Sequence, residues 1–179
     1  MARLFHDSFF SIRFITLVVV FLLGGCQPSS TEIAVGQRFP KVFLEGLDGK
    51  VEALSQYHGK VVVLNFWATW CEPCRREMPA LQRLSERVDP DKIVVLGVSV
   101  DEDVNLVREF NLKYGTKFAG YIDRDRKVSE GQLGLSAYPQ TFVISPDGFV
   151  ALLQQGEYRW ASTDVFDQLQ LLVMNNGDK

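Results

Sequence analysis

Two cysteines at the junction between an apolar run and an amphipathic segment constrain this sequence more than any other feature. The stretch from Val61 to Leu84 reads VVVLNFWATWCEPCRREMPALQRL, and its almost continuously apolar start, 61–67, is followed by Cys71 and Cys74. A short run rich in β-branched and aromatic residues predicts a strand that is covered on both faces. Apolar residues recur at helical spacing after Cys74. The sequence therefore predicts a buried strand that delivers two cysteines to the start of a helix.

The predicted helix has one buried stripe and one internal proline. Its apolar residues are spaced three to four positions apart, and they are Met78, Leu81, Leu84 and Val88. Pro79 lies within this segment, where its ring removes a backbone donor, so we expect a bend.

The N-terminus has the pattern of an export signal. Arg3 and Arg13 flank a weakly charged leader, and an apolar run follows at 14–23. This run is shorter than the roughly 20 apolar residues that a membrane-spanning helix needs, but it has the length of a signal-peptide core.

The residues after this run resemble the lipobox of bacterial lipoproteins. Leu-Gly-Gly-Cys ends at Cys26, and in that family the cysteine receives a diacylglycerol after the preceding peptide is removed. We therefore expect a signal peptide at 1–25, a lipidated tether at 26–33 and one domain at 34–179. The open alternative is an ordinary secretory signal with a chance cysteine, and the choice between inner and outer membrane is also open.

Composition limits the function classes. The chain has 179 residues, of which 46% are hydrophobic, and a formal net charge of −3, which together predict one globular domain. No basic run is present, so nucleic-acid binding has no support. We expect a monomer.

The cysteine count favours redox chemistry over a structural role. With Cys26 assigned to lipid, Cys71 and Cys74 are left, and a disulfide that closes so short a loop adds little stability. A zinc site would need two further ligands, and the only histidine beyond the predicted signal peptide is His58, which we expect on the surface of a turn.

The order of elements predicts an α/β fold. A hairpin comes first, a β-α-β-α alternation with an inserted helical segment follows, and a second hairpin and a last helix end the chain. We therefore expect a mixed central sheet flanked by helices on both faces. Beyond 61–67, strands are expected near 41–44, 51–54, 93–100, 118–122, 141–144 and 149–154, and further helices after 101–103, near 128–133 and from Ser162 or Thr163.

These features together resemble the thioredoxin superfamily. The resemblance rests on Trp-Cys-Glu-Pro-Cys between strand and helix, on Pro79 five residues after Cys74, and on Pro139 before the late hairpin. Within roughly 34–174 the chain is most similar to the TlpA/ResA-like membrane-anchored thiol-disulfide oxidoreductases. The resemblance implies a thioredoxin fold that uses no cofactor besides a redox-active Cys71–Cys74 disulfide.

In this fold Cys71 lies where the helix begins, so its sulfur faces free N–H groups and the positive end of the helix dipole. Both favour the thiolate. Arg75 and Arg76 add to this if they point toward the sulfur, and Glu72 opposes it. We expect a modestly lowered pKa for Cys71, which acts as the exposed nucleophile, while the more buried Cys74 resolves the mixed disulfide.

Glu77 follows Cys74 by three residues, which can place it on the cysteine face of the helix. The resemblance implies a proton acceptor for the cysteine pair at this position, and a solvated helix glutamate is the open alternative. Asn65 stands where similar cytoplasmic thioredoxins have a buried aspartate. Because asparagine cannot titrate, Glu77 is the natural substitute for that proton relay.

The resemblance also implies a substrate surface. Pro139 matches the cis-proline of the family, which brings the backbone of Tyr138 beside the cysteines to pair with an extended substrate. Without the resemblance, an ordinary turn proline is the expectation, since few X-Pro bonds are cis. Trp70 is expected to shape this surface together with Glu72 and Pro73.

The leading functional hypothesis is a lipid-anchored extracytoplasmic thiol-disulfide oxidoreductase that faces the periplasm or an equivalent space. By resemblance it reduces disulfides of exported proteins such as apocytochrome c, with electrons from a membrane thiol donor. General disulfide oxidase or isomerase activity is an alternative, because the sequence does not encode the direction of electron flow. Thiol peroxidases and copper chaperones also resemble the chain. The chain lacks the Thr-x-x-Cys motif of the peroxidases, and it lacks the wider cysteine spacing and the later histidine of the chaperones.

Overall fold

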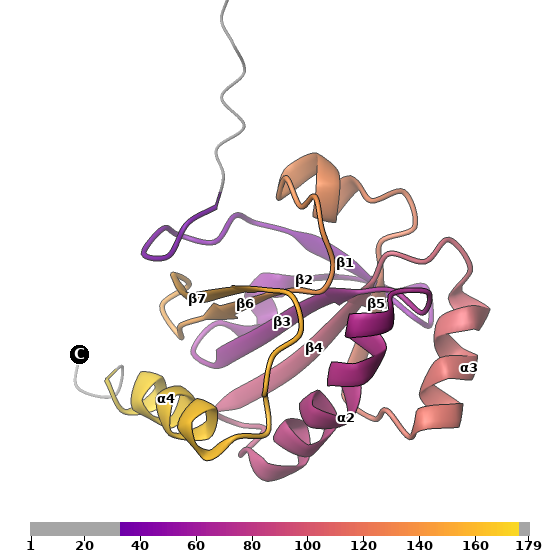
Figure 1. Cartoon of the computed structure of the whole chain (residues 1–179). Helices are drawn as coiled ribbons and strands as arrows, with labels where there is room; N and C mark the ends of the chain where they lie inside the picture. Colours follow the sequence, from indigo (N-terminus) through magenta and orange to yellow (C-terminus); the bar gives the residue numbers. More distant parts are fainter. Residues whose placement is uncertain (1–32, 176–179) are drawn as a thin grey trace, which may run out of the picture. The chain divides into compact units, whose positions relative to one another are not determined.

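The computed structural model describes residues 33–175, which form one mixed α/β domain (Figure 1). The predicted signal peptide and the predicted lipid site Cys26 lie outside the described residues, as does all of the tether except Ile33. Within the described part of the chain, no helix is long and apolar enough to cross a membrane.

Seven strands form a single sheet in the order β2-β1-β5-β4-β3-β6-β7. The strands are β1 (Phe43–Gly46), β2 (Val51–Ala53), β3 (Val61–Trp67), β4 (Ile93–Ser99), β5 (Ala119–Ile122), β6 (Gln140–Ile144) and β7 (Val150–Gln155). The helices are α2 (Glu72–Arg87), α3 (Val104–Tyr114) and α4 (Thr163–Met174), with a 3-10 turn η1 (Leu54–Tyr57) and a π-helical turn η2 (Lys127–Gln132). Each predicted element is present, with its ends shifted by a few residues.

Strand β3 is the interior strand that positions the cysteines. It runs parallel to β4 and antiparallel to β6, and all seven of its residues are buried, as the apolar run predicts. Its odd-numbered side chains Val61, Val63 and Trp67 belong to one core cluster, and Val62 and Leu64 on the opposite side belong to the other. The alternation follows from the two-residue period of a strand.

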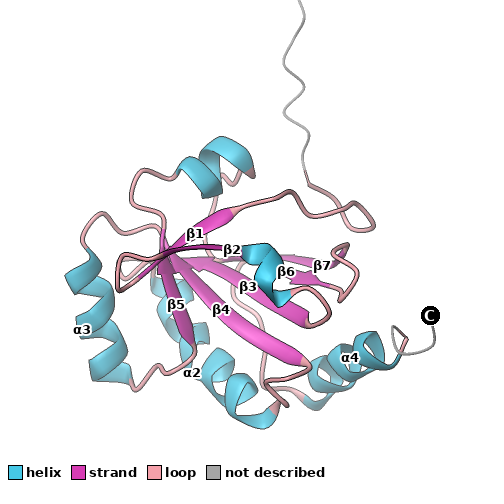
Figure 2. Cartoon of the chain, turned by 180° about the vertical axis from the view of Figure 1, so that it is seen from behind, coloured by secondary structure: helices cyan, strands magenta, loops and turns pink. Residues whose placement is uncertain are grey.

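The helices cover the two faces of the sheet unequally. Buried residues of α2, α3 and α4 pack in the cluster that contains Val61 and Val63. Residues of η1, of the segment just after η2 and of the segment before β1 contribute to the cluster on the other face. Figures 1 and 2, which view the domain from opposite sides, show α2 in front of the strands in the first and behind them in the second. The chain therefore crosses from β3 to β4 and from β4 to β5 over the same face, as successive right-handed crossovers require.

The aspartates of the acidic stretch 101–103 have different roles at the start of α3. Asp103 caps α3 by accepting a hydrogen bond from the backbone N–H of Asn105. Asp101 is instead buried at the end of β4, where its carboxylate accepts hydrogen bonds from Thr69. Net charge in a short stretch cannot distinguish a capping aspartate from one that a neighbouring loop surrounds.

Candidate active site

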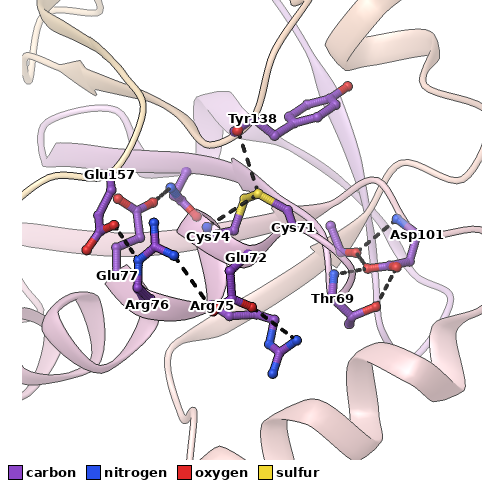
Figure 3. The surroundings of a disulfide bond; sticks show 12 residues. Thr69, Cys71, Glu72, Cys74, Arg75, Arg76, Glu77, Asp101, Tyr138 and Glu157 are labelled. Carbon is purple, nitrogen blue, oxygen red and sulfur yellow. Dashed lines mark hydrogen bonds and ion pairs between the residues drawn. A yellow bond between two sulfur atoms is a disulfide. The ribbon is translucent and has the colours of Figure 1, made fainter.

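The two cysteines lie at the first turn of α2 and form a disulfide with an S–S distance of 2.03 Å (Figure 3). Cys71 is the N-cap residue, and its Sγ accepts a hydrogen bond from the backbone N–H of Cys74 at 3.3 Å. Pro73 is tolerated in this first turn because the N–H that it lacks would have no intrahelical partner. The predicted placement of Cys71 at the positive end of the helix is confirmed.

Burial distinguishes the two sulfurs, but less than we predicted. Cys74 is fully buried, as expected, whereas Cys71 has only 6% of its surface exposed and so is not a freely exposed nucleophile. Trp70 beside it is 60% exposed. The residue next to the weakly exposed sulfur is thus a largely exposed aromatic side chain.

The charged residues of the first helical turns pair with one another and do not reach the sulfur. Arg75 and Arg76 lie 3.4 Å and 3.7 Å from the carboxylate of Glu72, and Arg76 also contacts Glu157 at 2.7 Å (Figure 3). These are the partners that helical spacing and solvent exposure favour. In the structure Arg75 and Arg76 thus pair with carboxylates, and the charge of Glu72 is paired as well.

Glu77 is buried, with 2% of its surface exposed, so the solvated-glutamate alternative is wrong. Its Oε1 accepts a hydrogen bond from Asn65 Nδ2 at 2.8 Å, and its Oε2 accepts bonds from the backbone N–H of Tyr158 and from Trp160 Nε1, each at 3.1 Å. Burial raises the pKa of Glu77 to about 7, although the hydrogen bonds from Trp160, Tyr158 and Asn65 favour its charged form. A group that titrates near neutral pH thus lies on the cysteine-bearing helix.

Sequence reasoning missed Tyr158 and Trp160. They lie 81 and 83 residues after Glu77, in the loop between β7 and α4, and no spacing rule connects them to the cysteines. The one available signal was the tryptophan itself, whose indole N–H needs a partner when the ring is buried.

The loop before β6 approaches the disulfide from the other side. The Tyr138–Pro139 peptide bond is cis, as the resemblance implied. The carbonyl oxygen of Tyr138 lies 3.6 Å from Cys71 Sγ, and the Tyr138 ring meets the Trp70 ring edge to face at 6.4 Å between centroids. Of the predicted substrate-binding residues, Tyr138 lies against the sulfur through its carbonyl and Trp70 contacts the Tyr138 ring, while Glu72 points to its arginine partners.

Between residues 33 and 175, no group of three or more His, Cys, Asp or Glu side chains is arranged to hold a metal ion. His58 is exposed after η1, as predicted for a surface residue.

Sequence comparison relates this site to redox proteins. Residues 35–153 match the AhpC/TSA family. The thiol-disulfide oxidoreductase ResA of Geobacillus thermodenitrificans is 37% identical over 126 residues, which cover 70% of this chain and 72% of that protein. The ResA protein of Bacillus subtilis is 36% identical over 124 residues, which cover 69% of each chain.

Structural comparison gives the same fold. A crystal structure from Chlorobium tepidum, assigned as a thiol:disulfide interchange protein DsbE, has a TM-score of 0.71 and 25% identity. The match covers 79% of this chain and 99% of that one. A secreted thiol-disulfide isomerase from Corynebacterium glutamicum has a TM-score of 0.68 at 24% identity, with 84% and 96% of the two chains covered.

Proposed function

The chain belongs to the AhpC/TSA family, and on this premise we propose that it is a lipid-anchored extracytoplasmic reductant of disulfides in exported proteins. Its relatives are named thiol-disulfide oxidoreductases, and the chain is a protein thiol-disulfide oxidoreductase that carries the redox pair Cys71–Cys74. The location, the substrates and the electron donor are the proposed part.

The reaction is a two-step thiol-disulfide exchange. In the dithiol form, the Cys71 thiolate attacks one sulfur of the substrate disulfide, which forms a mixed disulfide and releases one substrate thiolate. Cys74 then attacks the Cys71 sulfur and releases the second substrate thiolate. Two electrons pass to the substrate, and the enzyme is left with the Cys71–Cys74 disulfide, which is the state of the structure.

One observation carries the assignment of Cys71 as the attacking sulfur. Its Sγ faces the first turn of α2 and accepts the Cys74 N–H, so the thiolate gains both a hydrogen bond and the helix dipole. The Tyr138 carbonyl beside it provides backbone that an extended substrate can pair with. Cys74 has no exposed surface, so it attacks the Cys71 sulfur of the mixed disulfide and not a free substrate disulfide.

The proton step is assigned to Glu77. When the dithiol forms, Cys74 must hold or release a proton away from solvent, and Glu77 is buried on the same helix one turn later. With a pKa of about 7 it can accept or return that proton near neutral pH.

Export and anchoring rest on the N-terminal sequence. The charged leader, the apolar run 14–23 and the lipobox-like Cys26 support secretion followed by lipidation. An oxidising compartment holds most cysteine pairs as disulfides, so a reductant there needs electrons from a thiol donor in the membrane. Apocytochrome c, whose cysteines must be reduced before haem attachment, is the proposed substrate.

Trapping with Cys74→Ser tests this proposal. The variant cannot complete the second step, so substrates remain linked to Cys71 and are identified after release with a reductant. Haem-free cytochromes in the trapped set support the maturation role, and many unrelated secreted proteins would replace it with general disulfide repair. Cys71→Ser is the matched control and should trap nothing. If Cys74→Ser also traps nothing, the assignment of the nucleophile is wrong.

Cys26→Ser tests the lipid anchor separately and should abolish membrane attachment.

A further inference from the structure

Two buried aspartates outside the disulfide site have the same hydrogen-bond arrangement. Asp101 follows β4, and its carboxylate accepts bonds from the backbone N–H of Thr69 at 2.9 Å and from the Thr69 hydroxyl at 2.7 Å. Asp123 follows β5 and accepts bonds from the backbone N–H and the hydroxyl of Ser129, both at 2.7 Å. Each aspartate therefore fixes both the backbone and the side chain of one hydroxyl residue.

The sheet brings the two aspartates together through Ser99. β4 and β5 are parallel, with Ser99 paired to Ile122, so both strands end at the same edge of the sheet. The Ser99 hydroxyl donates to Asp101 Oδ2 at 2.6 Å, and the Ser99 carbonyl accepts from the Asp123 N–H at 2.7 Å. Hydrogen bonds to Ser99 therefore connect Asp101 with Asp123.

Each hydroxyl residue adjoins an aromatic side chain beside Cys71. Thr69 is the residue before Trp70. The Tyr138 hydroxyl lies 3.3 Å from Ser129 Oγ, to which it donates, and 3.4 Å from a carboxylate oxygen of Glu130. The Trp70 and Tyr138 rings meet edge to face, and the backbone carbonyl of Tyr138 lies against the Cys71 sulfur. Figure 3 shows Thr69 and Asp101 on one side of the disulfide and Tyr138 on another.

Holding the backbone before Trp70 and the hydroxyl of Tyr138 before a substrate arrives has a cost and a benefit. Two aspartates are removed from water, which is tolerated because each accepts several hydrogen bonds. In return, the rings need no ordering when a partner binds, and rigid exposed aromatic side chains are the residues that contribute most at binding surfaces. Trp70, with 60% of its surface exposed, presents such an apolar surface next to the reactive sulfur.

We propose that Asp101 and Asp123 are positioning residues that hold Trp70 and Tyr138 as a preformed apolar wall beside Cys71. This wall selects substrates with an apolar side chain next to the reacting cysteine. The inference rests on the proposed function and deepens it, because it names the substrate class that the same site prefers.

The test uses the full-length protein in detergent, with dithiothreitol as the electron donor and the uncatalysed rate subtracted. The substrates are two disulfide-linked peptides that differ only in the residue before the cysteine, Leu in one and Ser in the other. The wild type should reduce the Leu peptide with a kcat/KM about tenfold higher, because one aliphatic side chain is buried against the wall, and the difference should lie in KM.

Variants separate positioning from general stability. Thr69→Val removes one hydroxyl bond and Ser129→Ala removes the bonds that link Asp123 to Tyr138, and each should reduce the preference to about two- to threefold while kcat is kept. Thr69→Ser keeps the hydroxyl that donates to Asp101, so this variant should retain the tenfold preference. Ser136→Ala, at an exposed serine in the same loop as Tyr138, is the matched control and should leave the preference unchanged.

Equal kcat/KM values for the two peptides in the wild type would overturn the inference. So would variants that lose kcat equally for both peptides while the preference is retained, because that is the result of a structural defect alone. Failure of the proposed function looks different, since the dithiol protein would then reduce neither peptide.

Discussion

Asn65 on β3 donates a hydrogen bond through Nδ2 to Oε1 of Glu77 on α2 at 2.8 Å, inside the core behind the disulfide. This bond joins the strand that leads to the cysteines to the helix that carries them. Asn65 also donates to the Thr141 hydroxyl at 2.8 Å, so the amide is held in one orientation. The asparagine cannot take up a proton, and the titratable group of the pair is Glu77.

The raised pKa of Glu77 makes stability depend on pH. Burial raises this pKa from 4.5 to about 7, so the folded chain holds the proton more tightly than the unfolded chain does. The stabilisation is fully present below pH 4.5 and is lost as pH rises through 7, by about 3 kcal/mol in total for a shift of this size. Glu77→Gln should remove this part of the pH dependence when the oxidised protein is unfolded in denaturant. The same slope in both proteins would contradict the buried, neutral Glu77.

Glu77 should also appear in the pH dependence of the reaction. If it accepts the cysteine proton, the single-turnover rate of substrate reduction by the wild type has an inflection near pH 7, where Glu77 ionises. Glu77→Gln should lack this inflection. Glu86→Gln, at an exposed position of the same helix, is the matched control and should keep it. An unchanged profile in Glu77→Gln removes Glu77 from the mechanism.

Trp160 tunes the same group. Its indole N–H donates to Glu77 Oε2 at 3.1 Å and stabilises the charged carboxylate. Trp160→Phe removes the donor and keeps an aromatic ring, so the pKa of Glu77 should rise above 7 and the inflection in the rate should move to higher pH. Trp67→Phe removes a buried indole that does not bond to Glu77 and should leave the inflection in place. A downward shift in Trp160→Phe would contradict this assignment.

The strands, the helices and the position of the cysteine pair could be predicted because they follow local rules. The apolar run 61–67 becomes a fully buried strand, and Cys71 caps the helix that follows it. The surroundings of Glu77 could not be predicted in the same way. Tyr158 and Trp160 reach it from a loop more than 80 residues away, and only the folded chain brings them to the carboxylate.

Side-chain partners around the site follow from folding and not from the local sequence. Charge and spacing predict an effect of Arg75 and Arg76 on the sulfur only if they point toward it, and in the structure these exposed side chains pair with Glu72 and Glu157. The predicted helix after 101–103 is capped by Asp103, whereas Asp101 is a buried acceptor for Thr69. Sequence separation does not predict the partners Glu157 and Thr69, because the packing of loops around the strand ends brings them to Arg76 and Asp101.

Gly97 tests how closely the core is packed beside β3. A Cβ at this position would lie 2.8 Å from the Phe118 ring and 3.3 Å from Trp67 Nε1. Gly97→Ala should therefore lower the free energy of unfolding by about 1 to 3 kcal/mol, measured by denaturant unfolding. Gly131→Ala, whose Cβ would lie 3.9 Å from the carbonyl oxygen of Arg126, is the control. Equal stability of the two variants would show that Phe118 moves aside at little cost.

The central claim is that Cys71 is the attacking sulfur and Cys74 the resolving one. The most direct measurement is the rate at which each thiol of the reduced, full-length protein is alkylated, read by mass spectrometry after limited reaction with iodoacetamide near neutral pH. Because the Cys71 sulfur lies at the helix N-terminus and retains 6% exposure, whereas Cys74 is fully buried, we predict that Cys71 reacts at least about tenfold faster. Faster modification of Cys74, or equal rates at the two sulfurs, would contradict the account.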